Sequence, residues 1–296
     1  MNKSVAEKIG IIGLGLVGTA IAESLLSNKF DVVGFDIDPA KCDHLNELGG
    51  KAVGSPAEVA KEVDCVILSL PDTQVVRQVV EGPVGILQVK TPPTYIIDTT
   101  TGDPEETIAL AQRLAERGIY FLDATISGSS QQVRDKKAVF MVGGDKAAFE
   151  TCKDVFETLA EKVFYLGPSG NGSKAKLASN LILGLNRLAL AEGLVFAGKL
   201  GLEPETFFEL LKVTPAYSAI MDTKGKKMLN GDFTPQARLR QHHKDVSIIL
   251  KYAEKAGQEL PLSAVHLDVL QKAIAAGEGD LDNSAVIREI KRRKSL

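Results

Sequence analysis

The stretch from Lys8 to Gly18 reads KIGIIGLGLVG and decides the fold of the first half of this 296-residue chain. It joins an apolar run to three glycines with the spacing G-x-G-x-x-G, at Gly13, Gly15 and Gly18. In a strand–turn–helix unit, the first glycine permits a tight turn and the second lets backbone approach a pyrophosphate, while the third lets helix and strand pack closely. The phosphates would bind the N–H groups at the positive end of a helix that begins near Leu16.

An acidic residue follows this turn at the distance expected of a dinucleotide site. The run Val32–Asp36 ends a second apolar strand about 20 residues on, where an acid binds the ribose 2′-hydroxyl. Asp38 would repel a 2′-phosphate, and no arginine stands nearby to bind one. A structural turn followed by a surface aspartate is the alternative. We predict that NAD, favoured over NADP, binds at Gly13, Leu14, Gly15, Val17, Gly18 and Asp36.

Strand-like runs alternate with helix-length segments up to residue 167, which predicts a parallel sheet covered on both faces. The runs are Lys8–Ile12, Asp31–Asp36, Cys65–Leu70, Tyr95–Asp98, Tyr120–Leu122, Val139–Val142 and Val163–Leu166. The helical segments include Pro104–Arg117 and Lys146–Ala160. Beyond, the chain reads as helical, starting with one long helix from an N-cap at Ser173 to about Leu200. We predict an α/β Rossmann domain over residues 1–167 and an all-α domain over 168–296, joined by this long interdomain helix.

Composition and charge exclude several classes of protein. The chain is 44% hydrophobic and 25% charged, with a net charge of −3 and one basic run, Lys291–Lys294, so we expect no nucleic-acid partner. The first residues are polar, and no later segment reaches about 20 uninterrupted apolar residues, so we expect no membrane association and a cytoplasmic location. The three cysteines have no metal-binding spacing, and His242-His243 are adjacent, which makes a poor chelate. We expect no metal site.

Three further motifs follow the glycine turn in a fixed order. They are DATISGS at Asp123–Ser129, GNGSKAKLASN at Gly170–Asn180 and RLRQHHKD at Arg238–Asp245. With the turn, from about Lys8 to Glu289, they resemble the β-hydroxyacid dehydrogenase family, which includes 3-hydroxyisobutyrate dehydrogenase and tartronate semialdehyde reductase. The resemblance implies an oxidoreductase that transfers a hydride between NAD(P) and a small β-hydroxy acid and semialdehyde pair.

The resemblance also implies roles for the loops around the cofactor. Ser127, Gly128 and Ser129 would hold the substrate carboxylate, a role that suits a hydroxyl beside successive N–H groups in a glycine turn. Lys244 would place a cation that contacts substrate and cofactor. The strand-end segments that would line the nicotinamide contribute Leu70, Pro71 and Thr101.

Lys176 and Asn180 align with the family's catalytic lysine and its partner asparagine. Spacing alone describes this pair equally well as a solvated polar stripe, because residues i and i+4 share one face of any helix. Reduction of an aldehyde builds negative charge on oxygen, which an ammonium stabilises and then protonates. By resemblance, Lys176 is the general acid and base, and Asn180 positions the substrate. Lys174 is off-register with the motif.

The substrate and two alternative functions stay open. Thr125, Ser129 and Ser179 depart from the family pattern, so tartronate semialdehyde, 3-hydroxyisobutyrate, succinic semialdehyde and threonate-like sugar acids are all candidates. An imine reductase of the same architecture would be expected to lack Lys176, and a catalytically inactive dinucleotide-binding scaffold or sensor would be expected to lose Lys176 or Asn180. A sugar-phosphate oxidation like that of 6-phosphogluconate dehydrogenase would need more helical mass. The apolar helical half predicts a homodimer or homotetramer.

Overall fold

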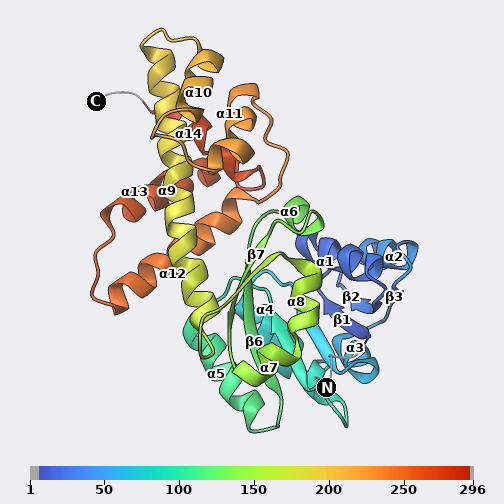
Figure 1. Ribbon diagram of the computed structural model, residues 1–296. Coiled ribbons are helices and arrows are strands. Elements are labelled where there is room, and N and C mark those ends of the chain that lie inside the picture. Colours follow the sequence, from blue (N-terminus) through green and yellow to red (C-terminus); the bar gives the residue numbers. More distant parts are fainter. Residues whose placement is uncertain (1–6, 294–296) are drawn as a thin grey trace. The chain divides into compact units, whose positions relative to one another are not determined.

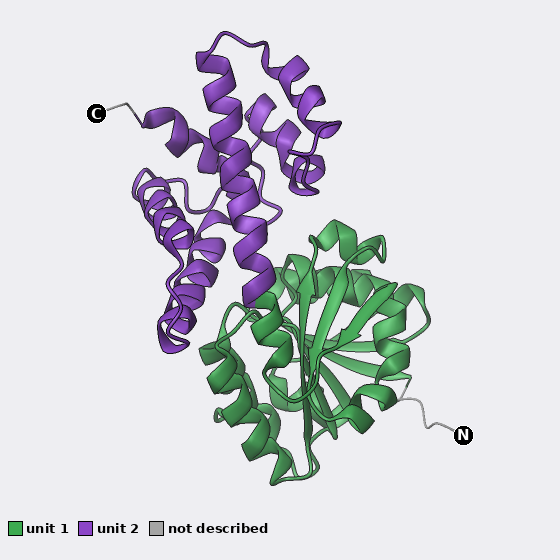
Figure 2. Ribbon diagram, turned by 60° about the vertical axis from the view of Figure 1, so that its left-hand side comes forward, with its two compact units in different colours: residues 1–176 green, residues 177–296 purple. Residues whose placement is uncertain are grey.

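The computed structural model describes residues 7–293. The chain divides into two compact units, unit 1 ending at Lys176 and unit 2 beginning at Leu177 (Figure 2). The division falls inside one continuous helix, α9 (Asn171–Lys199). The domain boundary expected after residue 167 therefore stays a prediction.

Unit 1 is built on an eight-stranded sheet with the order β3-β2-β1-β4-β5-β6-β7-β8 (Figure 1). The strands are β1 (Lys8–Ile12), β2 (Asp31–Phe35), β3 (Lys51–Ala52), β4 (Cys65–Leu68), β5 (Tyr95–Asp98), β6 (Tyr120–Ser127), β7 (Val139–Gly143) and β8 (Lys162–Tyr165). Neighbouring strands pair in parallel except β6 and β7, which are antiparallel. The expected parallel sheet is wrong at this pair, because the segment 128–138 is shorter than the dozen or so residues that a parallel crossover requires.

Helices cover both faces of the sheet, and alternate side chains of each central strand reach opposite faces. Cys65 and Ile67 of β4 belong to the core that packs against α1 and α8. Val66 and Leu68 belong to the core that packs against α3, α4 and α5. Both faces are buried, which explains why the strand is a continuous apolar run rather than an alternating one.

The helices of unit 1 begin where capping residues precede proline or polar residues. Asp38, Ser55, Asp72 and Asp103 each accept a hydrogen bond from the first turn of the helix that follows. The helices are α1 (Leu16–Ser27), α2 (Pro39–Glu47), α3 (Pro56–Glu62), α4 (Thr73–Glu81), the 3₁₀ turn η1 (Ile86–Gln88), α5 (Pro104–Ala115), α6 (Ser130–Arg134), α7 (Lys146–Thr151) and α8 (Lys153–Leu159). The single helix expected over 146–160 is two, because it is interrupted at Cys152.

Unit 2 is helical in its described residues, apart from one isolated bridge between Arg238 and Asp282. Beyond α9 its elements are α10 (Pro204–Lys212), the π-helix η2 (Met221–Gly225), α11 (Lys226–Asn230), α12 (Leu239–Lys255), α13 (Pro261–Ala275), the 3₁₀ turn η3 (Asn283–Ala285) and α14 (Val286–Arg292). Its core gathers apolar side chains from all these helices, Phe208, Val246 and Leu270 among them. In the basic run, Arg292 is exposed and pairs with Glu278 at 2.6 and 2.8 Å; Lys294 lies outside the described residues.

The helix α9 is the one described helix that is long and apolar enough to cross a membrane by length and composition. The core helix of a soluble protein meets the same criterion, and α9 carries buried polar groups, Asn180 and Arg187, that pack inside unit 2. Its start differs from the expectation. It begins at Asn171, so the predicted N-cap at Ser173 is wrong, because the Ser173 N–H is already capped by Asp123 of β6 at 2.8 Å.

Candidate active site

The glycine-rich turn connects β1 to α1 with the geometry that its spacing predicts. Gly13 has φ +93°, a conformation that L side chains rarely adopt, and a Cβ there would lie 2.2 Å from the carbonyl oxygen of Ser69. A Cβ on Gly18 would lie 1.9 Å from the Gly13 carbonyl oxygen, so α1 can approach the turn only with glycine at this position. These two glycines are required by the fold itself, with or without a ligand.

Gly15 differs, because a Cβ there would meet no atom within 4 Å. It is exposed and forms the N-cap of α1, where no side chain caps the first turn and no acidic residue lies in that turn. The N–H groups of this turn are thus open to an anion, with the helix dipole favouring negative charge. The turn fits a pyrophosphate. Leu14 is buried and Val17 is half-buried beside it.

Asp36 directly follows β2 and is held next to the glycine turn. Its Oδ2 accepts a hydrogen bond from the Leu14 N–H at 2.6 Å, and its Oδ1 accepts one from the Asp38 N–H at 2.9 Å. The carboxylate is half-buried and fixed, and each oxygen keeps further lone pairs for a ribose hydroxyl. Asp38 caps α2 through the Ala40 N–H, so a second negative charge stays beside Asp36.

The strand-end segments predicted for the nicotinamide side follow β4, which pairs with β1 across the point where the strand order reverses, and β5, which pairs with β4. The Leu70 N–H donates to Thr100 Oγ1 at 3.2 Å, which ties the two segments together. The Asp103 N–H donates to Thr73 Oγ1 at 2.8 Å and anchors the second segment, which contains Thr101. Thr101 and Leu70 are half-buried and Pro71 is exposed, at the carboxyl edge of the sheet where ligands of such folds bind.

The predicted carboxylate loop lies at the carboxyl end of β6. Ser127 is half-buried at the end of the strand, and Gly128 is exposed with φ +151°. A Cβ at Gly128 would lie 3.0 Å from Cβ of Ala138, so glycine is required here too. Ser129 has another role. It is the N-cap of α6, with its N–H donating to Gln132 Oε1 at 2.9 Å and its Oγ accepting from the Gln132 N–H at 3.2 Å.

Two buried residues of β6 anchor the start of α9. Asp123 accepts hydrogen bonds from the N–H groups of Gly170 and Ser173, each at 2.8 Å. Burial raises the pKa of Asp123, and these two N–H donors oppose the shift. Thr125, one of the departures from the family pattern, donates from Oγ1 to the Gly172 carbonyl at 2.9 Å. Its hydroxyl is therefore committed to α9.

Lys176 lies in the second turn of α9 with 9% of its surface exposed, whereas Lys174 is exposed. A buried lysine is rare unless its ammonium has a partner or a function. The two lysines, which the sequence analysis distinguished only by their register in the motif, thus also differ in burial. Lys176 and Asn180 are one helical turn apart on α9, and Asn180 is also buried.

Asn180 and the predicted Lys244 meet at one carboxylate in unit 2, that of Asp245 on α12. Asn180 Nδ2 donates to Asp245 Oδ2 at 3.0 Å, and Lys244 Nζ lies 3.3 Å from Asp245 Oδ1. Asp245 is 6% exposed, and Lys244 is half-buried. Sequence reasoning missed Asp245 as a site residue, although it ends the RLRQHHKD motif. It also missed Arg187, which is buried on α9.

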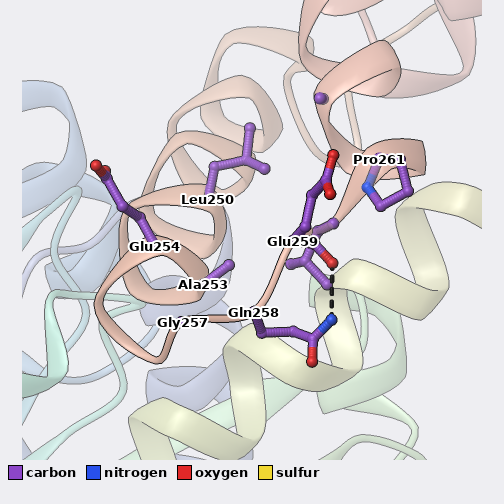
Figure 3. Close-up of a pocket in the computed structure, with 9 residues that line it drawn as sticks. Leu250, Ala253, Glu254, Gly257, Gln258, Glu259 and Pro261 are labelled. Carbon is purple, nitrogen blue, oxygen red and sulfur yellow. Dashed lines mark hydrogen bonds between the residues drawn. The ribbon is translucent and has the colours of Figure 1, made fainter.

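A separate surface pocket of about 340 Å³ lies in unit 2 where α12 ends and α13 begins (Figure 3). Leu250, Ala253 and Pro261 line it, and Gln258 Nε2 donates to the Glu259 carbonyl at its rim. None of the predicted site residues lines this pocket. It is a mostly apolar groove at a helix–helix turn, distinct from the motifs.

Two family models together match almost the whole chain. Residues 8–167 match the NAD binding domain of 6-phosphogluconate dehydrogenase. Residues 170–290 match a family described as the NAD-binding domain of NADP-dependent 3-hydroxyisobutyrate dehydrogenase.

Two relatives match over nearly their full length. Glyoxylate/succinic semialdehyde reductase 1 of Arabidopsis thaliana is 34% identical over 96% of this chain and 98% of its own. The 2-(hydroxymethyl)glutarate dehydrogenase of Eubacterium barkeri is 33% identical over 97% of this chain and 95% of its own. The crystal structure of a 3-hydroxyisobutyrate dehydrogenase from Salmonella typhimurium superimposes with a TM-score of 0.88 at 27% identity, covering 95% of this chain and 99% of that one.

Proposed function

This chain belongs to the β-hydroxyacid dehydrogenase family of NAD(P)-dependent oxidoreductases, and from that membership we propose that it interconverts a short carboxylate-bearing semialdehyde and its hydroxy acid, with Lys176 as acid and base. The predicted family, the Rossmann-plus-helical fold, the oxidoreductase class and the nicotinamide cofactor are confirmed. The fold is that of a soluble dehydrogenase. The identity of the substrate and the roles of individual residues are proposals.

Gly13–Gly18 and Asp36 would hold the dinucleotide, which supplies or accepts a hydride when bound. The uncapped N–H groups beginning at Gly15 bind the pyrophosphate, and the Asp36 carboxylate accepts hydrogen bonds from ribose hydroxyls. The paired negative charges of Asp36 and Asp38 repel a 2′-phosphate. This charge arrangement supports NAD over NADP for this chain.

Ser127 and Gly128 would bind the substrate carboxylate at the carboxyl edge of the sheet. The Ser127 hydroxyl can donate a hydrogen bond to an anion. So can the N–H of Gly128, which lies in a turn with a positive φ. Ser129 was predicted to contribute as well; its N–H is used in the cap of α6, where its Oγ only accepts, so its hydroxyl hydrogen can still donate to the carboxylate. Binding of the carboxylate at this loop would fix where the reacting carbon of the substrate lies.

Lys176 would move the proton. During reduction, its ammonium stabilises the negative charge that develops on the carbonyl oxygen and then donates a proton to it; during oxidation, the neutral amine accepts that proton from the hydroxyl. The burial of Lys176 carries this assignment, because it places the ammonium where water competes least. Asn180 would orient the same oxygen from one turn further along α9, while Lys244 supplies a second cation paired with Asp245.

The substrates named for the relatives define the chemical class. Glyoxylate, succinic semialdehyde and 2-(hydroxymethyl)glutarate all pair a carboxylate with a carbonyl or hydroxyl group a few bonds away. We propose the same class here. The departures at Thr125 and Ser129 do not argue against it, because both side chains make structural hydrogen bonds.

A panel of rates tests the proposal. Short semialdehydes and hydroxy acids are assayed with NAD(H) and with NADP(H), using the wild-type protein, Lys176→Met and the exposed control Lys174→Met. We expect turnover with NADH on at least one semialdehyde, a loss of about 10³-fold or more in Lys176→Met with NADH binding retained, and wild-type rates in Lys174→Met. Full activity of Lys176→Met would overturn the assignment. Tight NADH binding without turnover on any substrate would favour the inactive scaffold, and turnover on cyclic imines alone would favour an imine reductase.

We also propose that the protein works as a cytoplasmic homodimer or homotetramer, with a small acid as its ligand and neither nucleic acid nor membrane as a partner. Large apolar side chains of α9 and of the residue after it are exposed, Ile182 at 61%, Phe196 at 65% and Leu200 at 63%, and a second copy would bury them. Light scattering coupled to size exclusion measures the mass directly. A monomer at micromolar concentration would contradict this proposal.

A further inference from the structure

Arg187 of α9 carries a positive charge inside unit 2 without the hydrogen bonds that such a group usually has. It is 3% exposed, and its Nε and Nη1 have no hydrogen-bond partner among the described residues. Burial lowers the pKa of Arg187 to about 10, opposed by the charges of Asp282 and Asp245. The guanidinium therefore stays charged at neutral pH. A buried charge of this kind is costly, so its neighbours decide what it stabilises.

One of the two neighbouring acids is already neutralised. Lys224 Nζ lies 2.9 Å from both carboxylate oxygens of Asp282. The N–H groups of Gln236 and Ala237 and the Oγ of Ser284 donate to the same carboxylate. With its own cation and a full set of donors, Asp282 does not need Arg187 for compensation. The remaining acid is Asp245.

Asp245 joins the predicted site to the interior of unit 2. Its Oδ2 accepts the hydrogen bond from Asn180 Nδ2, and Lys244 approaches Oδ1 from the half-buried side. An ionised carboxylate can only accept hydrogen bonds, so Asn180 must turn its NH₂ group toward Asp245 and direct its carbonyl oxygen elsewhere. A protonated Asp245 could donate instead, and the amide could then flip. The charge on Asp245 thus decides which atom Asn180 presents.

The geometry of α9 brings Arg187 to the same side as Asn180. The two residues are seven apart, about two turns, and both are buried. Between them, a Cβ on Gly184 would lie 2.5 Å from His242 Nε2, so α9 and α12 are closely packed at this point. Arg187 and Asn180 therefore lie on the face of α9 that packs against α12, the helix that carries Asp245.

We propose that Arg187 is a positioning residue, which keeps Asp245 ionised and thereby fixes the orientation of the Asn180 amide. The inference rests on the proposed function, in which Asn180 orients the reacting oxygen. Arg187 itself touches neither substrate nor cofactor, since it is buried in the helical core. It acts through Asp245.

Other charged and titratable groups lie on the elements that carry Asp245 and Arg187 or pack against them. Lys244, His242 and His243 belong to the helix of Asp245, His266 of α13 contacts His242, and Asp282 with Lys224 lies near η3. His266 has its pKa lowered to about 4, by burial and then by the charge of Arg187, so it is neutral over the working range. Lys244 is the second cation on Asp245, but it is partly solvated, and its charge is screened more than that of Arg187.

The test compares Arg187→Met, Arg187→Gln and Arg187→Lys with the exposed control Arg240→Met, using the full-length protein. We expect the acid limb of the kcat–pH profile to move up by about one pH unit in the Met and Gln variants, with wild-type behaviour in Arg187→Lys and Arg240→Met. NADH affinity should not change, and circular dichroism verifies folding. The side-chain amide signals of Asn180, assigned by their loss in Asn180→Asp, should shift with pH over the same range as the acid limb.

A folded Arg187→Met or Arg187→Gln with the wild-type pH profile would overturn the inference, as would an equal shift in Arg187→Lys. Lys176→Met is measured alongside. If that variant keeps its activity, the proposed function fails, and the Asn180 amide signals then decide the inference alone. If no neutral variant at position 187 folds while Arg187→Lys does, the pH titration of the Asn180 amide in the wild-type protein decides. An amide that does not sense an acidic titration would contradict the role of Asp245.

Discussion

Three glycines of one turn have different physical tasks, although their spacing presents them as one motif. Gly13 and Gly18 are required by backbone conformation and by close approach, whereas the space around Gly15 is open. A motif that served the fold alone would not need glycine at the open position. The sequence pattern predicts the turn, and the structure shows that Gly15 is the one of the three glycines that the fold does not require.

Gly15→Ala therefore separates binding from stability. Because a Cβ at this position meets nothing, we expect the free energy of unfolding to stay within about 0.5 kcal/mol of the wild type. We expect NADH affinity to fall at least about tenfold, because the methyl group occupies the approach to the pyrophosphate. Fluorescence titration and urea unfolding measure the two quantities. The matched control is Gly193→Ala, another open glycine, within α9; NADH affinity lowered equally in both variants would refute the role of Gly15.

Residue types were predictable where a motif fixes them, and less so where a side chain could serve two purposes. Lys176, Asn180 and Asp36 were found from spacing and resemblance; Lys176 and Asn180 are buried, and Asp36 is held against the glycine turn. Ser129 was predicted to bind an anion, and it also forms a capping box with Gln132 that the sequence analysis did not identify. Serine followed three residues later by glutamine is the signal that could have shown this.

At the scale of elements, α9 depends on β6 for its start. Asp123 accepts hydrogen bonds from the N–H of Gly170, just before the helix, and of Ser173 in its first turn, and Thr125 donates to a carbonyl of the same turn. Sequence reasoning placed the N-cap inside the helix, at Ser173, because the true acceptor lies some 50 residues earlier in the chain. A local sequence pattern can predict an N-cap by a neighbouring residue, but it cannot predict capping by a side chain from a distant strand. The strand β7 was predicted, but its antiparallel direction was not, because strand direction follows from the length and path of a connection.

Asp123→Ala should be more destabilising than loss of an ordinary cap. It leaves two buried N–H groups without their acceptor, so we expect a cost of about 2–4 kcal/mol in the free energy of unfolding. Asp145→Ala, which removes the exposed cap of α7, should cost about 1 kcal/mol. Urea denaturation of both variants measures the difference. Equal costs would show that Asp123 acts only as a local cap.

His266 of α13 is buried against α9 and α12, and its burial predicts a pH dependence of stability. The pKa of His266 falls from 6.5 to about 4 on folding, so the unfolded state binds more protons between these values. Stability is therefore complete above pH 6.5 and falls as the pH is lowered toward 4. At pH 5 the loss is about 2 kcal/mol. His266→Gln should remove that part of the difference between pH 7 and pH 5, and the exposed His44→Gln should not; identical slopes in the wild type and His266→Gln would contradict the prediction.

At the scale of the whole molecule, the order of motifs predicted more than any single segment did. The glycine turn, the serine–glycine loop, the lysine helix and the KD motif are individually common, but their order along the chain identifies the family. The buried charges of unit 2 were beyond sequence reasoning. Arg187 lies among apolar neighbours of α9, Leu188 and Leu190, and its two acids, Asp245 and Asp282, come from elements far along the chain. Their meeting depends on how α9, α12 and η3 pack.

The central claim is that this protein transfers a hydride from a nicotinamide to the carbonyl carbon of a short semialdehyde while Lys176 supplies the proton. The most direct measurement supplies NADH with both C4 hydrogens replaced by deuterium, together with succinic semialdehyde or glyoxylate in ordinary water, and locates the deuterium by NMR. The account predicts one deuterium on the carbon that bears the new hydroxyl, and labelled product formed about 10³-fold more slowly or not at all with Lys176→Met. Product without deuterium at that carbon, or labelled product formed at the wild-type rate by Lys176→Met, would contradict it.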